Sequence, residues 1–79
     1  MFYVYVLRSK KDGKRYIGFT RDLERRIDEH KKGMVKSTKH RRPMELVYYE
    51  EYEIKSEAME REKFLKTGNG REWLRISNL

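Results

Sequence analysis

Five side chains in this sequence are of types that take part in acid–base or phosphate chemistry, and they stand among apolar residues. They are Tyr5, Tyr16, Arg26, His30 and Glu62. A phenol whose pKa is lowered by nearby cations can take a proton from water, and an arginine neutralises charge that develops on a phosphate. A carboxylate can hold one Mg²⁺ or Mn²⁺ whose other ligands are water and phosphate oxygens. If the fold brings them together, these groups suit metal-assisted attack of water on a phosphodiester.

Glu62 stands where a helix that contains it should face the core. Ala58, Met59 and Leu65 are predicted to form the apolar stripe of that helix. Glu62 follows Ala58 by four residues and precedes Leu65 by three, so it lies on the same helical face. A carboxylate is costly to bury there unless it is paired or binds a cation. Two interpretations stay open, a metal ligand and a structural ion pair with Arg26.

A second helical face combines apolar residues with Arg26 and His30. Leu23 and Ile27 predict its apolar edge, and His30 follows at the same spacing. Arg26 lies beside that edge, whereas Arg25 points to the opposite side. An arginine and a histidine four residues apart can grip a phosphate. The alternatives are a half-buried histidine bonded to a backbone carbonyl, and a surface arginine whose stem covers the core.

Tyr5 and Tyr16 belong to two segments that are predicted to pair as a hairpin. If the connecting loop has an even number of residues, both tyrosines project from the same face of the sheet. Gly18 lies on that face too, where it leaves room for a close approach to the backbone. The alternative is a cross-strand packing pair with exposed hydroxyls.

The predicted order of elements is ββαβαα. Strands are predicted over Phe2–Leu7, Arg15–Phe19 and Glu45–Tyr52, and Lys10–Gly13 forms a turn in which Asp-Gly supplies a positive φ. A hairpin between the first two strands indicates an α+β fold, with a small antiparallel sheet of about three strands flanked by helices. The 79 residues are expected to form a single domain.

The predicted helix boundaries are residues that commonly cap or stop helices. The first helix is predicted to start at Thr20 or Asp22 and to end at Lys32, before Gly33. The second is predicted to start at Ser56 and to end at Lys66 or Thr67, before Gly68. Residues Asn69–Glu72 resemble a capping box, which predicts the start of a short last helix. A basic loop is expected over residues 33–43, between the first helix and the third strand.

Charged residues make up 42% of the chain, but aromatic residues make up 13%. Because so many aromatic side chains are costly to leave in water, the composition indicates a folded chain. The absence of cysteine excludes disulfides, thiolate metal sites and cysteine nucleophiles, and it fits the cytoplasmic location that we expect. The longest uncharged apolar run, Phe2–Leu7, is far shorter than the roughly 20 residues that cross a bilayer. We therefore expect no membrane partner.

Positive charge is concentrated in the first half of the chain. Residues 1–43 carry 14 Lys or Arg and 5 Asp or Glu, whereas residues 44–79 carry 6 and 8. The stretch from Lys31 to Arg42 contains six basic residues and no acid. Such a field attracts polyanions, which predicts nucleic acid as a partner; a solvated basic surface, or attachment to the ribosome, is the alternative. The basic residues expected to contact nucleic acid are Lys31, Lys32, Lys36, Lys39, Arg41 and Arg42.

The spacing of these residues resembles that of the GIY-YIG nuclease domain. Tyr3-Val4-Tyr5 and Tyr16-Ile17-Gly18 match its two triplets, and Asp22–Arg26 with His30 follows them. The segment over residues 57–62 is similar to the metal-binding helix of the family. The resemblance covers residues 2 to about 66 and looks closest to small stand-alone bacterial members, some described as excinuclease-subunit-C-like, which implies a connection with DNA repair.

The resemblance implies a role for each of the five residues. Tyr5 and Tyr16 match the two tyrosines, either of which is implied as general base, and we favour Tyr5. Arg26 matches the phosphate-binding arginine, and His30 matches an active-site histidine of some members. Glu62 matches the single metal ligand, which implies one Mg²⁺ or Mn²⁺ ion.

The sequence also departs from the family pattern. Tyr3 and Val4 replace the glycine and isoleucine of the first triplet. Excision-repair relatives have an asparagine after the metal-binding helix, and Leu74 stands near that position here. Asn69 could replace this asparagine only by reaching the site from a different position in the chain. The Lys36-Ser37-Thr38 loop sits where other members place residues that reach the substrate, so Ser37 and Thr38 are expected to contact nucleic acid as well.

Homing and restriction members of the family use a second DNA-binding domain for specificity, and none is expected within these 79 residues. We therefore expect a metal-dependent endonuclease with little intrinsic sequence specificity, acting on DNA rather than RNA, with a protein partner as a source of specificity. The alternative is a nucleic-acid binding module that retains the nuclease fold without cleaving.

Overall fold

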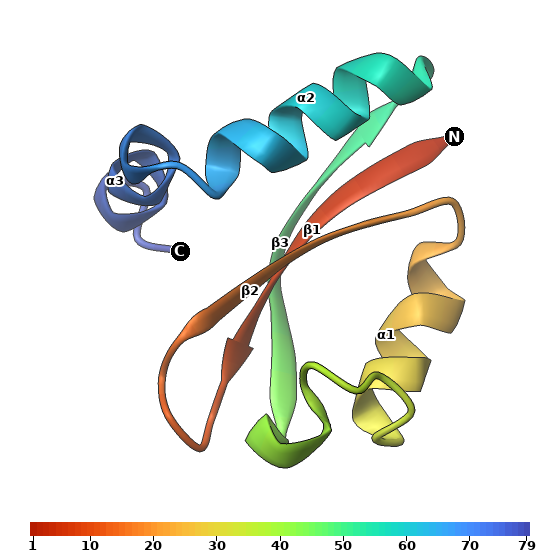
Figure 1. The fold of residues 1–79 in the computed structure, drawn as a ribbon, viewed down its shortest axis with the longest axis vertical. Helices are drawn as coiled ribbons and strands as arrows, with labels where there is room; N and C mark the ends of the chain where they lie inside the picture. Colours follow the sequence, from red (N-terminus) through yellow and green to blue (C-terminus); the bar gives the residue numbers. More distant parts are fainter.

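The computed structural model describes residues 1–79, and its elements follow the predicted order ββαβαα. The strands are β1 (Phe2–Ser9), β2 (Arg15–Thr20) and β3 (Met44–Tyr52), which form one antiparallel sheet in the order β2-β1-β3. The helices are α1 (Leu23–Lys31), α2 (Lys55–Leu65) and α3 (Gly68–Ile76), with a short 3-10 turn at Lys39–Arg41. The α+β fold class is confirmed (Figure 1). No helix combines the length and the apolar character that a membrane span requires.

The hairpin of β1 and β2 places the two tyrosines on one face of the sheet. Ser9 N donates to Lys14 O at 2.9 Å, which encloses the four-residue turn Lys10–Gly13. The glycine of this turn has a φ of +73°, as the Asp-Gly pair predicts. Because the loop is even-numbered, Tyr5 and Tyr16 project to the same side, and the expectation from strand alternation is confirmed.

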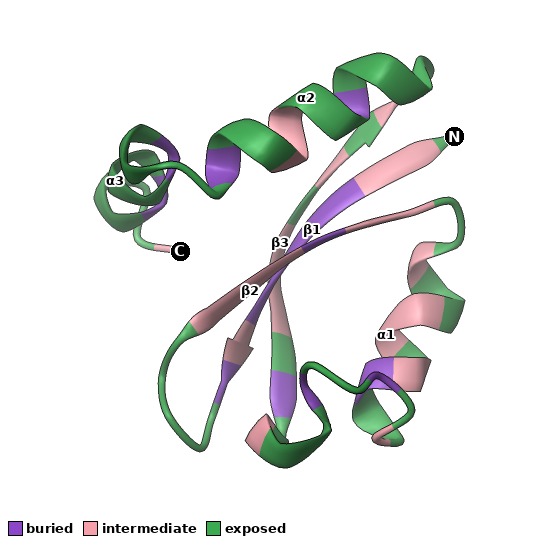
Figure 2. Ribbon diagram, in the orientation of Figure 1, coloured by how far each residue is buried: buried purple, intermediate pink, exposed green.

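The two faces of the sheet carry separate hydrophobic clusters. Figure 1 shows α1 on one side of the sheet and α2 with α3 on the other, and Figure 2 shows that the buried residues of α2 and α3 turn toward the sheet. The buried cluster of the α2–α3 face consists of Val4, Val6, Ala58, Leu65 and Leu74. The buried cluster of the α1 face consists of Tyr5, Leu7 and Met44, against which Tyr16, Leu23, Ile27 and Leu46 pack.

A half-buried ion pair fixes α2 against β3. Glu50 accepts hydrogen bonds from Arg61 Nε at 2.9 Å and from Arg61 Nη2 at 3.0 Å, and the hydroxyls of Tyr48 and Tyr52 donate to the same carboxylate. The Arg61 guanidinium also lies over the Trp73 ring, 4.7 Å from its centroid, and so connects β3, α2 and α3. Bidentate geometry of this kind restricts how α2 can slide on the sheet.

The predicted start of the last helix is wrong. Its N-cap is Thr67, whose Oγ1 accepts from Gly70 N at 3.1 Å, and Asn69 lies inside the helix. Helix α2 ends at Leu65, and Gly68 is the first residue of α3. Threonine and asparagine are both good N-cap residues, so composition does not decide between them.

Candidate active site

A buried chain of three polar side chains lies between the sheet and α1. The Tyr5 hydroxyl oxygen is 2.9 Å from His30 Nε2, and Thr38 Oγ1 is 2.7 Å from His30 Nδ1. All three residues are buried, so both ring nitrogens of the histidine are satisfied by side chains. The alternative of a half-buried histidine bonded to a backbone carbonyl is wrong.

The sequence of α1 explains why His30 reaches Tyr5. Asp22 caps the helix, because its Oδ1 accepts from Arg25 N at 3.1 Å. Leu23 and Ile27 then pack against the α1 face of the sheet, and His30 follows on the same stripe. The apolar contacts of the first two turns thus direct the imidazole toward the central strand.

Tyr16 completes an aromatic group around His30. Its ring centroid lies 5.2 Å from that of His30 and 6.5 Å from that of Tyr5. Tyr16 is half-buried and belongs to the edge strand β2, whereas Tyr5 is buried on the central strand. Gly18 is buried beside them, and the Tyr5 ring itself fills the space that a side chain there would need.

The surroundings keep His30 uncharged at neutral pH. Burial, assisted by the positive charge of Arg26, lowers the pKa of His30 to about 4. A neutral imidazole has one N–H and one acceptor nitrogen. If Thr38 Oγ1 accepts from Nδ1, then Nε2 accepts from the Tyr5 hydroxyl. Burial raises the pKa of Tyr5, and the guanidinium of Arg26 opposes this rise.

Arg26 lies at the rim of this group. Its contact with the Tyr5 phenol raises the pKa of the guanidinium. Arg26 Nη1 also donates to Glu29 Oε1 at 3.0 Å, and the side chain is 36% exposed, compared with 74% for Arg25. The predicted difference between the two neighbouring arginines is therefore confirmed, because only Arg26 lies against the sheet.

Glu62 lies on α2, which covers the face of the sheet opposite to α1. It stands between the buried residues Ala58 and Leu65 of the core-facing stripe, as the spacing predicts. Met59 is 49% exposed and does not belong to that stripe; successive helical residues are about 100° apart, so Met59 faces away when Ala58 faces the core.

The carboxylate of Glu62 pairs with Lys66 and not with Arg26. Lys66 Nζ lies 3.1 Å from Glu62 Oε2, one helical turn away. The alternative of a structural Glu62–Arg26 ion pair is wrong. The Glu62 side chain is 23% exposed, and it is close enough to Tyr5 to add to the rise in the pKa of that phenol, which burial dominates.

The chemistry of the donor set around Glu62 fits a hydrated divalent cation. The structure contains no group of three or more acidic or histidine side chains that could enclose a metal ion. Mg²⁺ keeps several of its waters and is often held by only one or two carboxylates together with substrate phosphates. A single, partly exposed carboxylate such as that of Glu62 satisfies this requirement.

The basic loop contributes one residue to the buried site and several to the surface. Thr38, which we expected to contact nucleic acid, is fully buried against His30, so that expectation is corrected. Its hydroxyl is needed inside because His30 Nδ1 would otherwise lack a partner. The exposed members of the expected set are Lys31, Lys32, Lys36, Ser37, Lys39 and Arg42.

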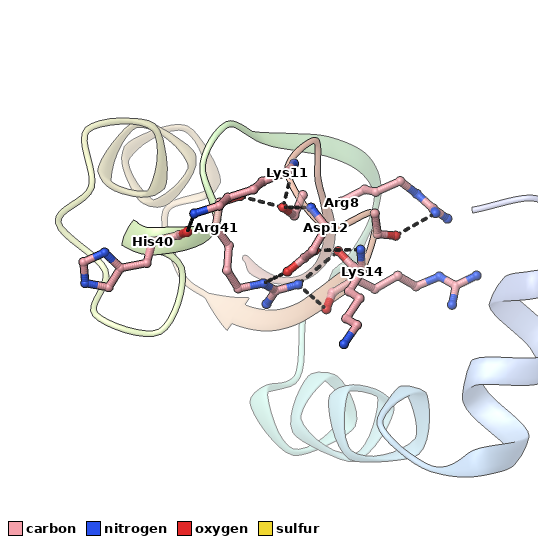
Figure 3. Close-up of polar contacts among 9 residues, drawn as sticks. Arg8, Lys11, Asp12, Lys14, His40 and Arg41 are labelled. Carbon is pink, nitrogen blue, oxygen red and sulfur yellow. Dashed lines mark hydrogen bonds and ion pairs between the residues drawn. The ribbon is translucent and has the colours of Figure 1, made fainter.

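Arg41 clamps the loop to the hairpin. Its Nε donates to Asp12 Oδ2 at 3.0 Å and its Nη2 donates to Lys14 O at 3.1 Å, while Ser9 Oγ donates to Arg41 O at 2.6 Å (Figure 3). A hydrogen bond from the Lys14 backbone, and then the Arg41 guanidinium, lower the pKa of Asp12 to about 2. The guanidinium of Arg41 is thus occupied within the protein and holds the loop that carries Thr38.

Sequence reasoning missed three residues that position the site. Ser9 and Asp12 anchor the loop, but their partners lie about 30 residues away, so no local pattern indicates them. Lys66 has a visible signal, because a glutamate followed by a lysine four residues later is a common helical pair.

Comparisons with known proteins find a matching family and similar chains. The GIY-YIG catalytic domain matches residues 1–74. A UPF0213 protein of Staphylococcus saprophyticus is 43% identical over 75 residues, which cover 94% of this chain and 90% of that protein. A UPF0213 protein of Staphylococcus aureus shows the same identity and coverage. Among solved structures, the solution NMR structure of a UPF0213 protein from Bacillus halodurans is 39% identical, covers 96% of this chain and 84% of that one, and has a TM-score of 0.60.

Proposed function

Because this chain belongs to the GIY-YIG catalytic-domain family, we propose that it is a divalent-metal-dependent endonuclease that hydrolyses phosphodiester bonds in nucleic acid. We take DNA rather than RNA as the substrate, with little sequence specificity in the domain itself and a protein partner as the source of any specificity. The observation that carries the proposal is the 2.9 Å contact between the Tyr5 hydroxyl and a neutral His30, with Arg26 beside the same phenol.

Tyr5 and His30 together can act as a general base. As the attacking water gives its proton to the Tyr5 oxygen, the phenolic proton moves to His30 Nε2. Because the pKa of His30 is about 4, the imidazolium formed in this way readily returns its proton to the Tyr5 oxygen, and Tyr5 in turn gives one to the leaving oxygen or to solvent. Thr38 orients the imidazole through Nδ1, which keeps Nε2 as the acceptor.

Arg26 and Tyr16 form the accessible rim of the site. The guanidinium of Arg26 contacts Tyr5 and remains partly exposed, so it can bind a phosphate oxygen in exchange for its contact with Glu29. As negative charge develops on the phosphate, this contact becomes stronger. The half-buried Tyr16 lies where a phosphate reaches it directly, whereas burial restricts Tyr5 to a reactant as small as water.

Glu62 is the residue that would hold the metal ion. A bound divalent cation supplies neutralisation of phosphate charge and polarisation of the phosphoryl oxygen. Lys66 pairs with the Glu62 carboxylate in the free protein, so a metal ion held by Glu62 would take the place of the lysine as the partner of that carboxylate.

A non-cleaving nucleic-acid binding module is the second candidate function. Two observations favour it: the Glu62 carboxylate is neutralised by Lys66, and burial raises the pKa of Tyr5 away from the physiological range. Both would suit a site that binds phosphate without attacking it.

A cleavage assay separates the two functions. Supercoiled, branched and single-stranded substrates are incubated with the protein and Mg²⁺ or Mn²⁺, with EDTA as one control and Glu62→Ala as the other. The endonuclease function predicts cleavage that requires both the metal and Glu62. Binding of the same substrates without any cleavage would leave the binding module as the function.

A further inference from the structure

A groove lies between the start of β2 and the helices α2 and α3. It has a volume of about 590 Å³, and β2 residues form one wall while the end of α2 and the middle of α3 form the other. Ile17, Leu65 and Leu74 supply its apolar lining. Of the candidate site residues on the α1 face, only Tyr16 lines this groove.

Positive charge dominates the rim of the groove. Lys14 and Arg15 stand on the hairpin side, Lys66 and Arg71 stand on the helical side, and no acidic residue lines the groove. Lys66 and Arg71 are notable because they come from residues 44–79, which carry more acidic than basic side chains overall. A concave surface lined by charge of one sign concentrates the field and attracts a polyanion.

Two of the four cations of the groove, Lys14 and Arg71, are available to a ligand, whereas Arg15 Nε already donates to Leu79 O at 2.7 Å. The Lys14 amine makes no hydrogen bond or ion pair, and Figure 3 shows its side chain extending away from the Arg41 clamp. Arg71 is exposed, and its side chain makes only one hydrogen bond, from Nη2 to Lys66 O at 3.2 Å. Lys66 is 55% exposed and pairs with Glu62 alone.

The groove is continuous with the candidate active site. Tyr16, whose ring packs on His30 at 5.2 Å, also lines the groove. Lys66 lines the groove while its amine contacts the Glu62 carboxylate. A strand that crosses the free edge of β2 would therefore pass from the Arg26 rim to the groove without leaving the protein surface.

We propose that this groove binds the sugar–phosphate backbone of a single nucleic-acid strand next to the bond that is cleaved. The inference rests on the proposed function in taking nucleic acid as the ligand, and it adds a phosphate-binding surface on the α2–α3 face that is separate from the basic loop. The volume suits a segment of one strand, since pockets of about 300–1,000 Å³ hold small-molecule-sized ligands, and a duplex is too wide to enter. A basic rim with one aromatic side chain, Tyr16, in the lining matches the way single strands are held, by phosphate contacts together with stacking of a base on an aromatic ring.

A binding experiment with two double variants tests the groove. The probe is a dye-labelled single-stranded DNA of about 12 nucleotides, within the usual site sizes, and its affinity is measured by fluorescence anisotropy in EDTA at several KCl concentrations. The test variant is Lys14→Ala/Arg71→Ala. The control variant is Lys55→Ala/Lys63→Ala, which removes the same charge from exposed positions of α2 that do not line the groove.

The groove predicts a specific loss of phosphate contacts. Each contact to a single strand contributes about 0.7 to the slope of log affinity against log salt, so the test variant should lower that slope by about 1.4 and the control should not. A blunt duplex of the same sequence should bind the test variant and the control with the same slope. Lys14→Glu alone, at a side chain without a polar contact in the protein, should weaken single-strand binding in the same direction while leaving the melting temperature unchanged.

The outcomes separate failure of the groove from failure of the proposed function. Equal slopes for the test and control variants on single-stranded DNA, in a protein that still binds and cleaves nucleic acid, would overturn the groove alone. A wild-type protein that binds neither single-stranded nor duplex DNA at low salt would overturn both proposals.

Discussion

The ring of Tyr5 occupies the space where residue 18 would carry a side chain. A Cβ atom added at Gly18 would lie 2.2 Å from Tyr5 Cζ and 2.3 Å from the hydroxyl oxygen. Glycine at this position therefore allows the phenol to lie flat across β2 and reach His30 Nε2. Gly18, the last residue of the Tyr-Ile-Gly triplet, therefore contributes to the site by leaving space for the Tyr5 ring.

Gly18→Ala should displace Tyr5 and break its contact with His30. The ring is buried on all sides, so it cannot swing away freely, and overpacking of this kind costs about 1–3 kcal/mol. Thermal melts should show this loss, and any cleavage activity should fall with it. Gly68→Ala is the matched control, because an added Cβ there meets nothing within 4 Å; a similar loss in both variants would contradict the packing role of Gly18.

The pKa of His30 predicts how stability depends on pH. Because this pKa is about 4 in the folded protein and about 6.5 in an unfolded chain, the unfolded state binds more protons between these two values. Stability is fully present above pH 6.5 and decreases as the pH falls toward 4, with a contribution of up to about 1.4 kcal/mol per pH unit from this residue. Denaturant unfolding at several pH values measures the slope.

His30→Gln should reduce that slope, whereas His40→Gln, at an exposed position, should leave it unchanged. Acidic groups such as Asp12 also lose stabilising contacts at low pH, and the comparison of variants cancels their contribution because they are present in all three proteins. An unchanged slope in His30→Gln would show that the imidazole is not held neutral by the fold.

Arg26→Ala should abolish cleavage while weakening nucleic-acid binding only modestly. A contact that strengthens as charge develops on the phosphate affects the rate more than ground-state affinity. Arg25→Ala, at the neighbouring and more exposed position, should have little effect on turnover. Rates and affinities of both variants are compared on one substrate, and equal defects would mean that the helical face has been assigned wrongly.

The two tyrosines should differ when each hydroxyl is removed. Tyr5→Phe removes the group that contacts His30 and should lower kcat by about 10²–10⁴-fold, the usual contribution of a general base. Tyr16→Phe should act mainly on KM, because that phenol lies at the half-buried rim. A larger effect of Tyr16→Phe on kcat would transfer the role of general base to the second tyrosine.

Strand alternation and helical periodicity predicted most of what forms the α1 face. The Asp-Gly turn set the register that puts Tyr5 and Tyr16 on one side, and the Leu23–Ile27 spacing put His30 on the same side of α1. These are short-range relationships, and each depends on a regular backbone.

The rest depends on contacts between distant segments. Thr38 lies in an irregular loop whose path is fixed by Ser9 and Arg41, so its burial has no periodic signal. The spacing placed Glu62 on the core side of α2 but could not show that α2 and α1 cover opposite faces of the sheet. The Thr67 cap was missed because Asn69 offered an equally good local pattern.

The role of Glu62 as metal ligand is tested most directly by a metal titration and a thermal melt of Glu62→Gln. In the free protein Glu62 pairs only with Lys66 at i,i+4, a partly exposed pair that contributes about 0.3–0.5 kcal/mol. If Glu62 holds the metal ion, Glu62→Gln should melt at a temperature close to that of the wild type and should lose Mg²⁺ or Mn²⁺ binding and cleavage. A strongly destabilised Glu62→Gln that still binds the metal as the wild type does would show that Glu62 is a structural residue and not the metal ligand.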